Sequence, residues 1–192
     1  MNWIIENWIE IVGALIGFIY IFFEIKVNKW MWPIGILTSI FYIIIFFNSK
    51  FYADMSLQFY YIVISIIGWY WWNKEQNLNK ELKIRKLNKT LLLQLILSST
   101  IVFIFLSYIL VNYTDSPLPY WDSLTTALSI IATWMLARKI IEQWILWIII
   151  DLISMLLYLY KGLYPTSILF LIYSGLAIIG YLQWKKLYLI KN

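Results

Sequence analysis

The stretch Trp144-Ile-Leu-Trp147-Ile-Ile-Ile-Asp151 lies within a long apolar run from Ile140 to Tyr160. On a helix, Trp144, Trp147 and Asp151 share one face, because they follow one another at spacings of three and four residues. A carboxylate at the centre of a lipid-spanning helix costs roughly 2.5–3.5 kcal/mol on insertion scales, and such residues usually face a bundle interior or an aqueous cavity. Two indole rings beside a carboxylate are the groups that bind a flat organic cation. The stretch therefore predicts one half of a solute-binding site in a membrane helix.

The composition extends this prediction to the whole chain. Of the 192 residues, 62% are hydrophobic and 13% are charged, whereas soluble domains are about half apolar and about a quarter charged. The chain is therefore expected to be an all-α integral membrane protein. It has no Cys and no His, which excludes disulfides, thiol nucleophiles and histidine-based catalysis. We accordingly expect no cofactor, no metal site and no enzymatic activity.

Seven apolar segments have about the 17–25 residues that a transmembrane helix needs. They are joined mostly by short connections, and the one long polar stretch, Asn73–Lys89, is predicted to be a solvated loop or a short interfacial helix. The predicted helices are Trp8–Ile25, Met31–Phe47, Asp54–Trp72, Thr90–Asn112, Tyr120–Ala137, Ile141–Tyr160 and Tyr164–Trp184.

Lys and Arg are distributed unequally between the two sides of such a bundle. With seven spans, 13 of the 15 basic residues fall on one side, and only Lys50 and Lys161 fall on the other. Basic loops are typically cytoplasmic, so we expect a cytoplasmic C-terminus and an outer N-terminus. This layout also accounts for the isoelectric point of about 9.2 without nucleic-acid binding. Because the first residues lack a basic region and a small-residue cleavage site, we expect no removal of a signal peptide.

The chain also matches itself at an offset of 112 residues. Trp32 aligns with Trp144, and the further aligned pairs are Tyr61 with Tyr173, Gly68 with Gly180, and Trp72 with Trp184. The offset spans four predicted helices, so both copies have the same orientation. This predicts two parallel triple-helix repeats, at 1–72 and 113–192, joined by a loop and linker helix at 73–112. In transporters built from repeats, substrate sites lie between the repeats near the midplane.

Six motifs are distributed along nearly the whole chain, between Trp8 and Lys186. They are Trp-Met-Trp-Pro-Ile-Gly at 30–35, Lys-Phe-Tyr-Ala-Asp at 50–54, Leu-Gln-Phe-Tyr-Tyr at 57–61, Gly-Trp-Tyr-Trp-Trp at 68–72, Arg-Lys-Ile-Ile-Glu-Gln-Trp at 138–144 and Gly-Tyr-Leu-Gln-Trp at 180–184. In combination, these motifs resemble the PnuC vitamin transporters.

This resemblance implies a SWEET-like fold and uptake of nicotinamide riboside across a bacterial inner membrane by facilitated diffusion, with trapping by a cytosolic kinase. It also implies a homotrimer. Asp151 stands where the nicotinamide riboside branch often has Asn, whereas branches associated with thiamine or riboflavin can carry Asp. Thiamine and riboflavin therefore remain alternative substrates.

The predicted substrate-binding residues lie on helical stripes of both repeats. Indole rings would stack on a cationic ring, the carboxylate would offset its charge, and the hydroxyl and amide groups would hydrogen-bond the hydroxylated arm. These residues are Trp32, Ser39, Gln58, Tyr61, Trp144, Trp147, Asp151 and Tyr173.

Other prominent side chains have a simpler interpretation. Trp72 and Trp184 are expected to anchor span ends at the membrane interface, and Gly68 and Gly180 to provide helix contacts. Glu24 and Glu142 are expected to form salt bridges at the basic edge, and Asp54 and Asp122 to lie near the outer interface.

A membrane enzyme or a scaffold that does not transport is the competing class of function. An enzyme without His or Cys would need several carboxylates, and only Asp151 is predicted deep in a span. A scaffold would not need midplane polar residues that differ between the repeats, such as Ser39 and Asp151. Because no paired acids are predicted within the membrane, transport without ion coupling is favoured.

Overall fold

The computed structural model describes residues 8–48, 52–77 and 83–191, and in these ranges the regular structure is seven α-helices. Lys50 and Lys80, which were counted among the basic residues that predict the orientation, lie outside the described residues. The helices are α2 (Trp8–Ile25), α3 (Met31–Asn48), α4 (Tyr52–Asn77), α5 (Lys89–Tyr113), α6 (Pro119–Ala137), α7 (Gln143–Tyr160) and α8 (Tyr164–Lys191).

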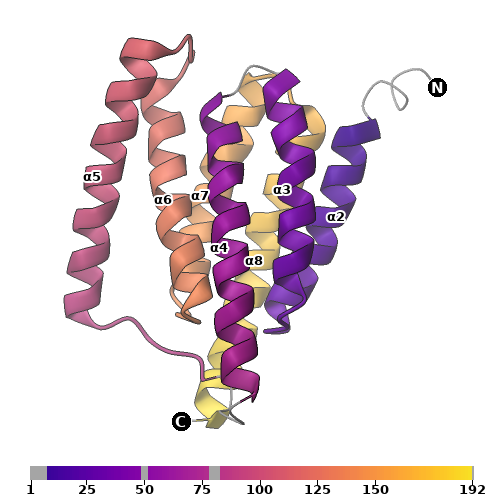
Figure 1. Cartoon of the computed structure of the whole chain (residues 1–192), viewed down its shortest axis with the longest axis vertical. Helices are drawn as coiled ribbons and strands as arrows, with labels where there is room; N and C mark the ends of the chain where they lie inside the picture. The colour runs from indigo at the N-terminus through magenta and orange to yellow at the C-terminus, as the bar shows by residue number, and fades with distance from the viewer. Residues whose placement is uncertain (1–7, 49–51, 78–82, 192) are drawn as a thin grey trace.

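The helix boundaries follow the apolar segments closely, with two exceptions. Helix α2 begins and ends where the sequence predicts, whereas α4 continues beyond Trp72 and α8 continues beyond Trp184. The extensions consist largely of Lys, Glu, Gln and Leu, which favour helix. Hydropathy predicts where an apolar span ends, but the helix itself continues until its backbone is capped or broken. Both extensions project from the same end of the bundle (Figure 1).

Six of the described helices form a closed ring. Helices α2, α3 and α4 pack in chain order, as do α6, α7 and α8, and the ring is closed by contacts of α4 with α6 and of α2 with α8. Helix α5 lies outside the ring against α6 (Figure 1), and the side chains of only two of its residues are buried. Every ring helix therefore has one face toward a common centre.

The 112-residue offset also relates structural details. The bounds of α3 map onto those of α7, and α2 and α6 end at equivalent residues. Both of these ends continue into a left-handed residue, Val27 with φ 53° and Lys139 with φ 58°. The next amide donates to the carbonyl five residues earlier in each case, Asn28 to Phe23 and Ile140 to Met135, both at 2.9 Å, which is a common way to end a helix.

The described end of the polar connection after α4, at 83–88, is attached to the bundle. Ile84 is buried in the main apolar cluster. The Arg85 amide donates to the Lys139 carbonyl at 2.9 Å, and the Ile141 amide donates to the Arg85 carbonyl at 3.0 Å. The prediction of a solvated loop is therefore wrong for these residues, because a single apolar side chain and two backbone hydrogen bonds attach them to the α6–α7 connection.

Three helices, α5, α7 and α8, are long and apolar enough to cross a membrane by length and composition. The apolar parts of α2 and α3 are shorter, at Ile11–Ile25 and Met31–Phe47. Helix α6 has polar side chains that are buried rather than exposed: Ser123, Thr125, Thr126, Ser129 and Thr133. The polar side chains of α6 therefore face protein, where their hydroxyl groups can hydrogen-bond to the helix backbone or to neighbouring helices.

Candidate substrate-binding site

The centre of the ring contains a cavity to which all six ring helices contribute. Seven of the eight residues predicted to bind substrate line it: Ser39, Gln58, Tyr61, Trp144, Trp147, Asp151 and Tyr173. The eighth, Trp32, is fully buried but is not among the lining residues. The predicted binding residues of both halves of the chain therefore surround the same cavity.

Asp151 lies in the middle of α7 and is 3% exposed. Its carboxylate forms no ion pair with a residue in the described ranges. Trp147, one turn earlier, lines the same cavity, and its Nε1 has no hydrogen-bond partner in the described structure. An isolated buried carboxylate is unfavourable, so this side of the cavity is suited to a cationic ligand.

A second carboxylate, that of Glu24, also lines the cavity and is 3% exposed. Gln143 Nε2 donates to Glu24 Oε1 at 3.4 Å. The expectation of a salt bridge at the basic edge is therefore wrong for Glu24, and so is the expectation of a single acid within the membrane. Glu142 does lie at the edge, but there it accepts from the Leu87 amide at 2.9 Å.

Lys26 follows Glu24 by two residues in the sequence and was one of the basic residues expected to pair with it. Side chains two residues apart on a helix do not face one another, and Lys26 Nζ lies over the Phe22 ring instead, 4.1 Å from its centroid. Tyr20, one turn before Glu24, also lines the cavity. Spacing of four residues between Tyr20 and Glu24 was therefore the signal in the sequence that could have identified this face of α2.

Two Trp–Gly contacts set the inner walls of the ring. An atom added at the Cβ position of Gly180 would lie 2.6 Å from the Trp144 ring, and one added to Gly68 would lie 2.5 Å from the Trp32 ring. Trp72 and Trp184 pack edge-on against Trp32 and Trp144, at centroid distances of 5.5 and 5.7 Å.

Trp72 and Trp184 are fully buried, so the prediction that they anchor the membrane interface is wrong. Their Nε1 atoms donate to the Ala137 carbonyl at 3.1 Å and to the Glu24 carbonyl at 3.2 Å. Each indole therefore connects a helix of one half to the end of a helix in the other half. The sequence cannot distinguish a Trp that anchors the membrane interface from a buried Trp that joins two helices, since both lie near the end of an apolar span.

Alanine substitutions at these glycines are expected to separate packing from binding. Gly180→Ala and Gly68→Ala should each lower the free energy of unfolding by about 1–3 kcal/mol, because a methyl group must displace an indole. Only Gly180→Ala should also weaken ligand binding, since Trp144 lines the cavity and Trp32 does not. Thermal unfolding and ligand titration measure the two effects. Gly175→Ala on α8, which meets nothing within 4 Å, is the control; equal loss of binding in both indole-contact variants would contradict the assignment.

Aromatic rings form one end of the cavity lining. Phe46 and Phe170 line it, and both rings contact Tyr158, at centroid distances of 5.8 and 5.0 Å. Tyr158 in turn donates from its hydroxyl to Asp54 Oδ1 at 3.1 Å. The aromatic layer is thus continuous with a polar cluster at the end of the bundle where α7 ends and α8 begins.

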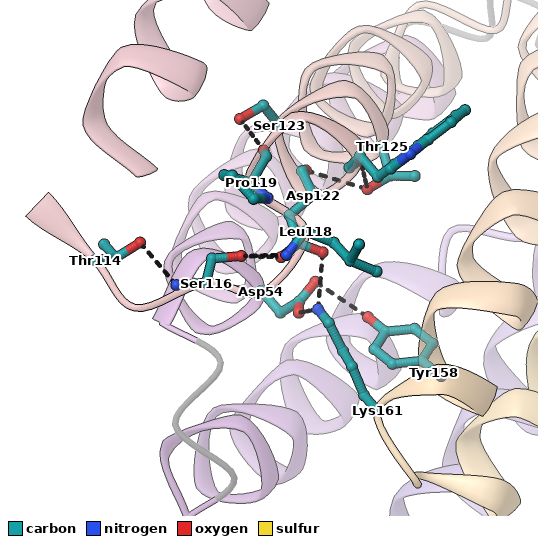
Figure 2. Close-up of polar contacts among 11 residues, drawn as sticks. Asp54, Thr114, Ser116, Leu118, Pro119, Asp122, Ser123, Thr125, Tyr158 and Lys161 are labelled. Carbon is teal, nitrogen blue, oxygen red and sulfur yellow. Dashed lines mark hydrogen bonds and ion pairs between the residues drawn. The ribbon is translucent and has the colours of Figure 1, made fainter. Parts of the chain in front are cut away.

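Lys161 is the centre of this polar cluster (Figure 2). Its Nζ contacts Asp54 Oδ2 at 3.2 Å and Asp122 Oδ1 at 2.8 Å. Ser116 donates from its hydroxyl to Asp122 Oδ2 at 2.7 Å. Burial lowers the pKa of Lys161, but Asp54 and Asp122 more than offset this, so that its pKa is raised. The cluster joins α4 to α6 and to the end of α7, that is, one half of the chain to the other.

The cavity can therefore hold a solute with positive charge. Its lining contains two carboxylates, several hydroxyls, one amide and two indoles, and includes no Lys or Arg among the described residues. No three acidic side chains in the described ranges come together as a metal site. The halves differ at positions that are equivalent in the repeat: Ser39 corresponds to Asp151, and Gln58 corresponds to Phe170. The cavity can therefore orient an asymmetric molecule.

Comparison with known proteins gives consistent matches along the chain. A family model described as nicotinamide mononucleotide transporter matches residues 7–186. The chain is 29% identical to the nicotinamide riboside transporter PnuC of Escherichia coli K12, covering 93% of this chain and 85% of that protein. It is 21% identical to the riboflavin/roseoflavin transporter RibM of Streptomyces davaonensis, covering 92% and 84%. The crystal structure of a vitamin B3 transporter PnuC has the same fold, with a TM-score of 0.84 and 23% identity over 97% of this chain and 84% of that one.

Proposed function

Because the chain belongs to the nicotinamide mononucleotide transporter family, we propose that it is a membrane transporter that takes up nicotinamide riboside. The observation that carries this choice of substrate is the charge of the cavity. Asp151 and Glu24 line it without a basic side chain among the described lining residues. A nucleotide would bring a phosphate against two acids, whereas the riboside brings only a cationic ring. Relatives named for nicotinamide riboside support the same substrate.

The lining residues have distinct roles in this proposal. The carboxylate of Asp151 offsets the charge of the pyridinium ring, and the indoles of Trp144 and Trp147 contact its face. Gln58 and Tyr61 hydrogen-bond the ribose hydroxyls, together with Ser39 and Tyr173. Trp32 packs against Gly68 and Trp72 outside the cavity lining and therefore has no direct contact with the ligand in this proposal.

Thiamine is the second candidate, because the same acidic cavity suits any flat cation with a hydroxylated arm. Riboflavin is neutral, so the two carboxylates give no reason to favour it, although a relative is named for its transport. A direct comparison of these ligands distinguishes the candidates.

In the proposed transport cycle, all seven helices cross the inner membrane, with the N-terminus outside and the C-terminus in the cytoplasm. The units are the two triple-helix bundles at 1–72 and 113–192, which rock about the cavity, and the linker at 73–112. Alternating access of this kind exposes a fixed midplane site to each side in turn. The cluster around Lys161 would close the outer end, and the extensions of α4 and α8 would lie in the cytoplasm.

We further propose facilitated diffusion, with a cytosolic kinase that phosphorylates the riboside and so retains it, and a homotrimeric assembly. The facilitated diffusion, the kinase and the homotrimer are all proposed from the resemblance to the family. Counterflow in liposomes without an ion gradient should proceed at the same rate as with one. Accumulation driven by a pH gradient would contradict uncoupled transport, and the mass of the purified complex tests the trimer.

The substrate is tested by tryptophan fluorescence of the purified protein, titrated with nicotinamide riboside, nicotinamide mononucleotide, thiamine and riboflavin. We expect saturable quenching by the riboside and little or none by the mononucleotide at equal concentration. Equal affinity for the mononucleotide would contradict the role assigned to the acidic cavity. Absence of binding by both the riboside and thiamine would contradict the proposed function.

A further inference from the structure

Glu24 is a cavity residue whose position is not explained by a structural ion pair. It is 3% exposed in the last turn of α2, lines the cavity, and forms no ion pair with a described residue. A buried carboxylate is retained at a cost unless something compensates it. The compensation visible within the protein is a long hydrogen bond from Gln143 Nε2 at 3.4 Å and a hydrogen bond from the Tyr20 hydroxyl, with no basic side chain among the described residues.

The surroundings of Glu24 fix its backbone and leave its carboxylate available. Trp184 Nε1 donates to the Glu24 carbonyl at 3.2 Å and so ties the end of α2 to α8. An ionised carboxylate has two oxygens with about four acceptor positions in all, and the Gln143 amide and the Tyr20 hydroxyl occupy two of them. The remaining acceptor positions are available to a ligand in the cavity.

The repeat shows that the two acids are placed asymmetrically. The position equivalent to Glu24 in the second half is Leu136, and the position equivalent to Asp151 in the first half is Ser39. Each half therefore contributes one carboxylate, from a different helix, α2 in one case and α7 in the other. A ligand with a single charged ring needs only one of them, so the second acid must meet a different part of the ligand.

We propose that Glu24 is a specificity-determining residue that accepts a hydrogen bond from an NH₂ group of the same ligand whose cationic ring is offset in charge by Asp151. This inference rests on the proposed function. The carboxamide of nicotinamide riboside and the amine of the thiamine pyrimidine both carry such a group. An analogue with a carboxylate or an oxo group at that point presents an acceptor to an acceptor, which leaves buried polar groups unpaired.

Discrimination between matched ligand pairs tests this role. The wild-type protein should bind nicotinamide riboside at least about tenfold more tightly than nicotinic acid riboside, as expected for a hydrogen bond to a charged group. If thiamine is the ligand that binds, its counterpart is oxythiamine, in which an oxo group replaces the amine. Wild-type protein that binds both members of a pair equally would overturn the proposal without any substitution.

Glu24→Gln should reduce that discrimination toward unity, mainly because the amide no longer repels a carboxylate. Glu24→Leu introduces the residue found at the equivalent position of the other repeat. It should weaken binding of the NH₂-bearing ligand by about tenfold or more. Glu142→Gln is the control, since Glu142 accepts from the Leu87 amide and is not among the residues that line the cavity.

The outcomes separate the inference from the proposed function. Binding of the riboside or thiamine by wild-type protein, with discrimination unchanged in both Glu24 variants, overturns the role of Glu24 and leaves the transporter assignment intact. Failure of the wild-type protein to bind either ligand overturns both. Unfolding temperatures near wild type for Glu24→Gln would show that a change in discrimination comes from the cavity.

Discussion

Substitution of Asp151 by Asn is expected to weaken binding of nicotinamide riboside by about ten- to a hundredfold, the range expected for loss of a charge-assisted contact. The side chain keeps its size, so packing against α8 changes little. Asp151 is 3% exposed in the middle of α7 and has no ion-pair partner in the described ranges. Removal of its charge therefore acts on the ligand rather than on another side chain.

Reduced nicotinamide riboside gives the matched measurement, because its dihydropyridine ring is uncharged while its ribose and carboxamide are the same. Binding of the reduced form should change little in Asp151→Asn. Ser154→Ala serves as the control variant, since Ser154 is buried one turn later on α7 but is not a lining residue. If Asp151→Asn weakens both forms equally, Asp151 positions the cavity instead of offsetting charge.

The face of α7 that carries Asp151 was predictable because its residues are unusual in a lipid-spanning helix. Indoles and a carboxylate at helical spacing are expensive to expose to lipid, so they indicate an interior face. The 112-residue offset then located the second wall of the site, including Ser39 and Gln58. Sequence could identify these residues because each belongs to a repeated stripe.

Glu24 and Trp184 show why the rest could not be predicted. Each lies near a basic span end, where sequence alone suggests a salt bridge or an interfacial anchor. The contact of Trp184 with the Glu24 carbonyl joins α8 to α2 across 160 positions of sequence. Such a contact depends on how the two halves of the ring meet, and neither composition nor periodicity specifies that arrangement.

Substitution of Lys161 by Met is expected to have the largest effect on stability. Lys161 Nζ lies between the carboxylates of Asp54 and Asp122, and these two residues are 8% and 4% exposed. Removing one partner of a buried ion pair typically costs about 3–5 kcal/mol, because the remaining charge is left uncompensated. Here two carboxylates would face each other. The free energy of unfolding in mixed detergent, with the unfolded fraction followed by tryptophan fluorescence, measures the loss.

The pH dependence follows from the raised pKa of Lys161. A group whose pKa is higher in the folded state stabilises the protein fully below its unfolded pKa, about 10.4 for Lys. That stability is lost only as the pH rises through the folded pKa. Lys161 should therefore contribute equally from pH 6 to pH 9, and the free energy of unfolding of the wild type should show no pH-dependent step there that is missing in Lys161→Arg. Lys161→Arg, which keeps the charge, is the control.

Loss of Lys161 should also open the end of the cavity that the aromatic layer lines. The cluster holds α4 of one half against α6 and α7 of the other, and through Tyr158 it supports the rings of Phe46 and Phe170. The natural chain has no Cys, so Gln58→Cys places a single thiol in the cavity wall. A membrane-impermeant thiol reagent added outside should label it several times faster in Lys161→Met than with Lys161 present. Equal labelling rates, despite a loss of stability, would mean that the cluster holds the fold together but does not control access to the cavity.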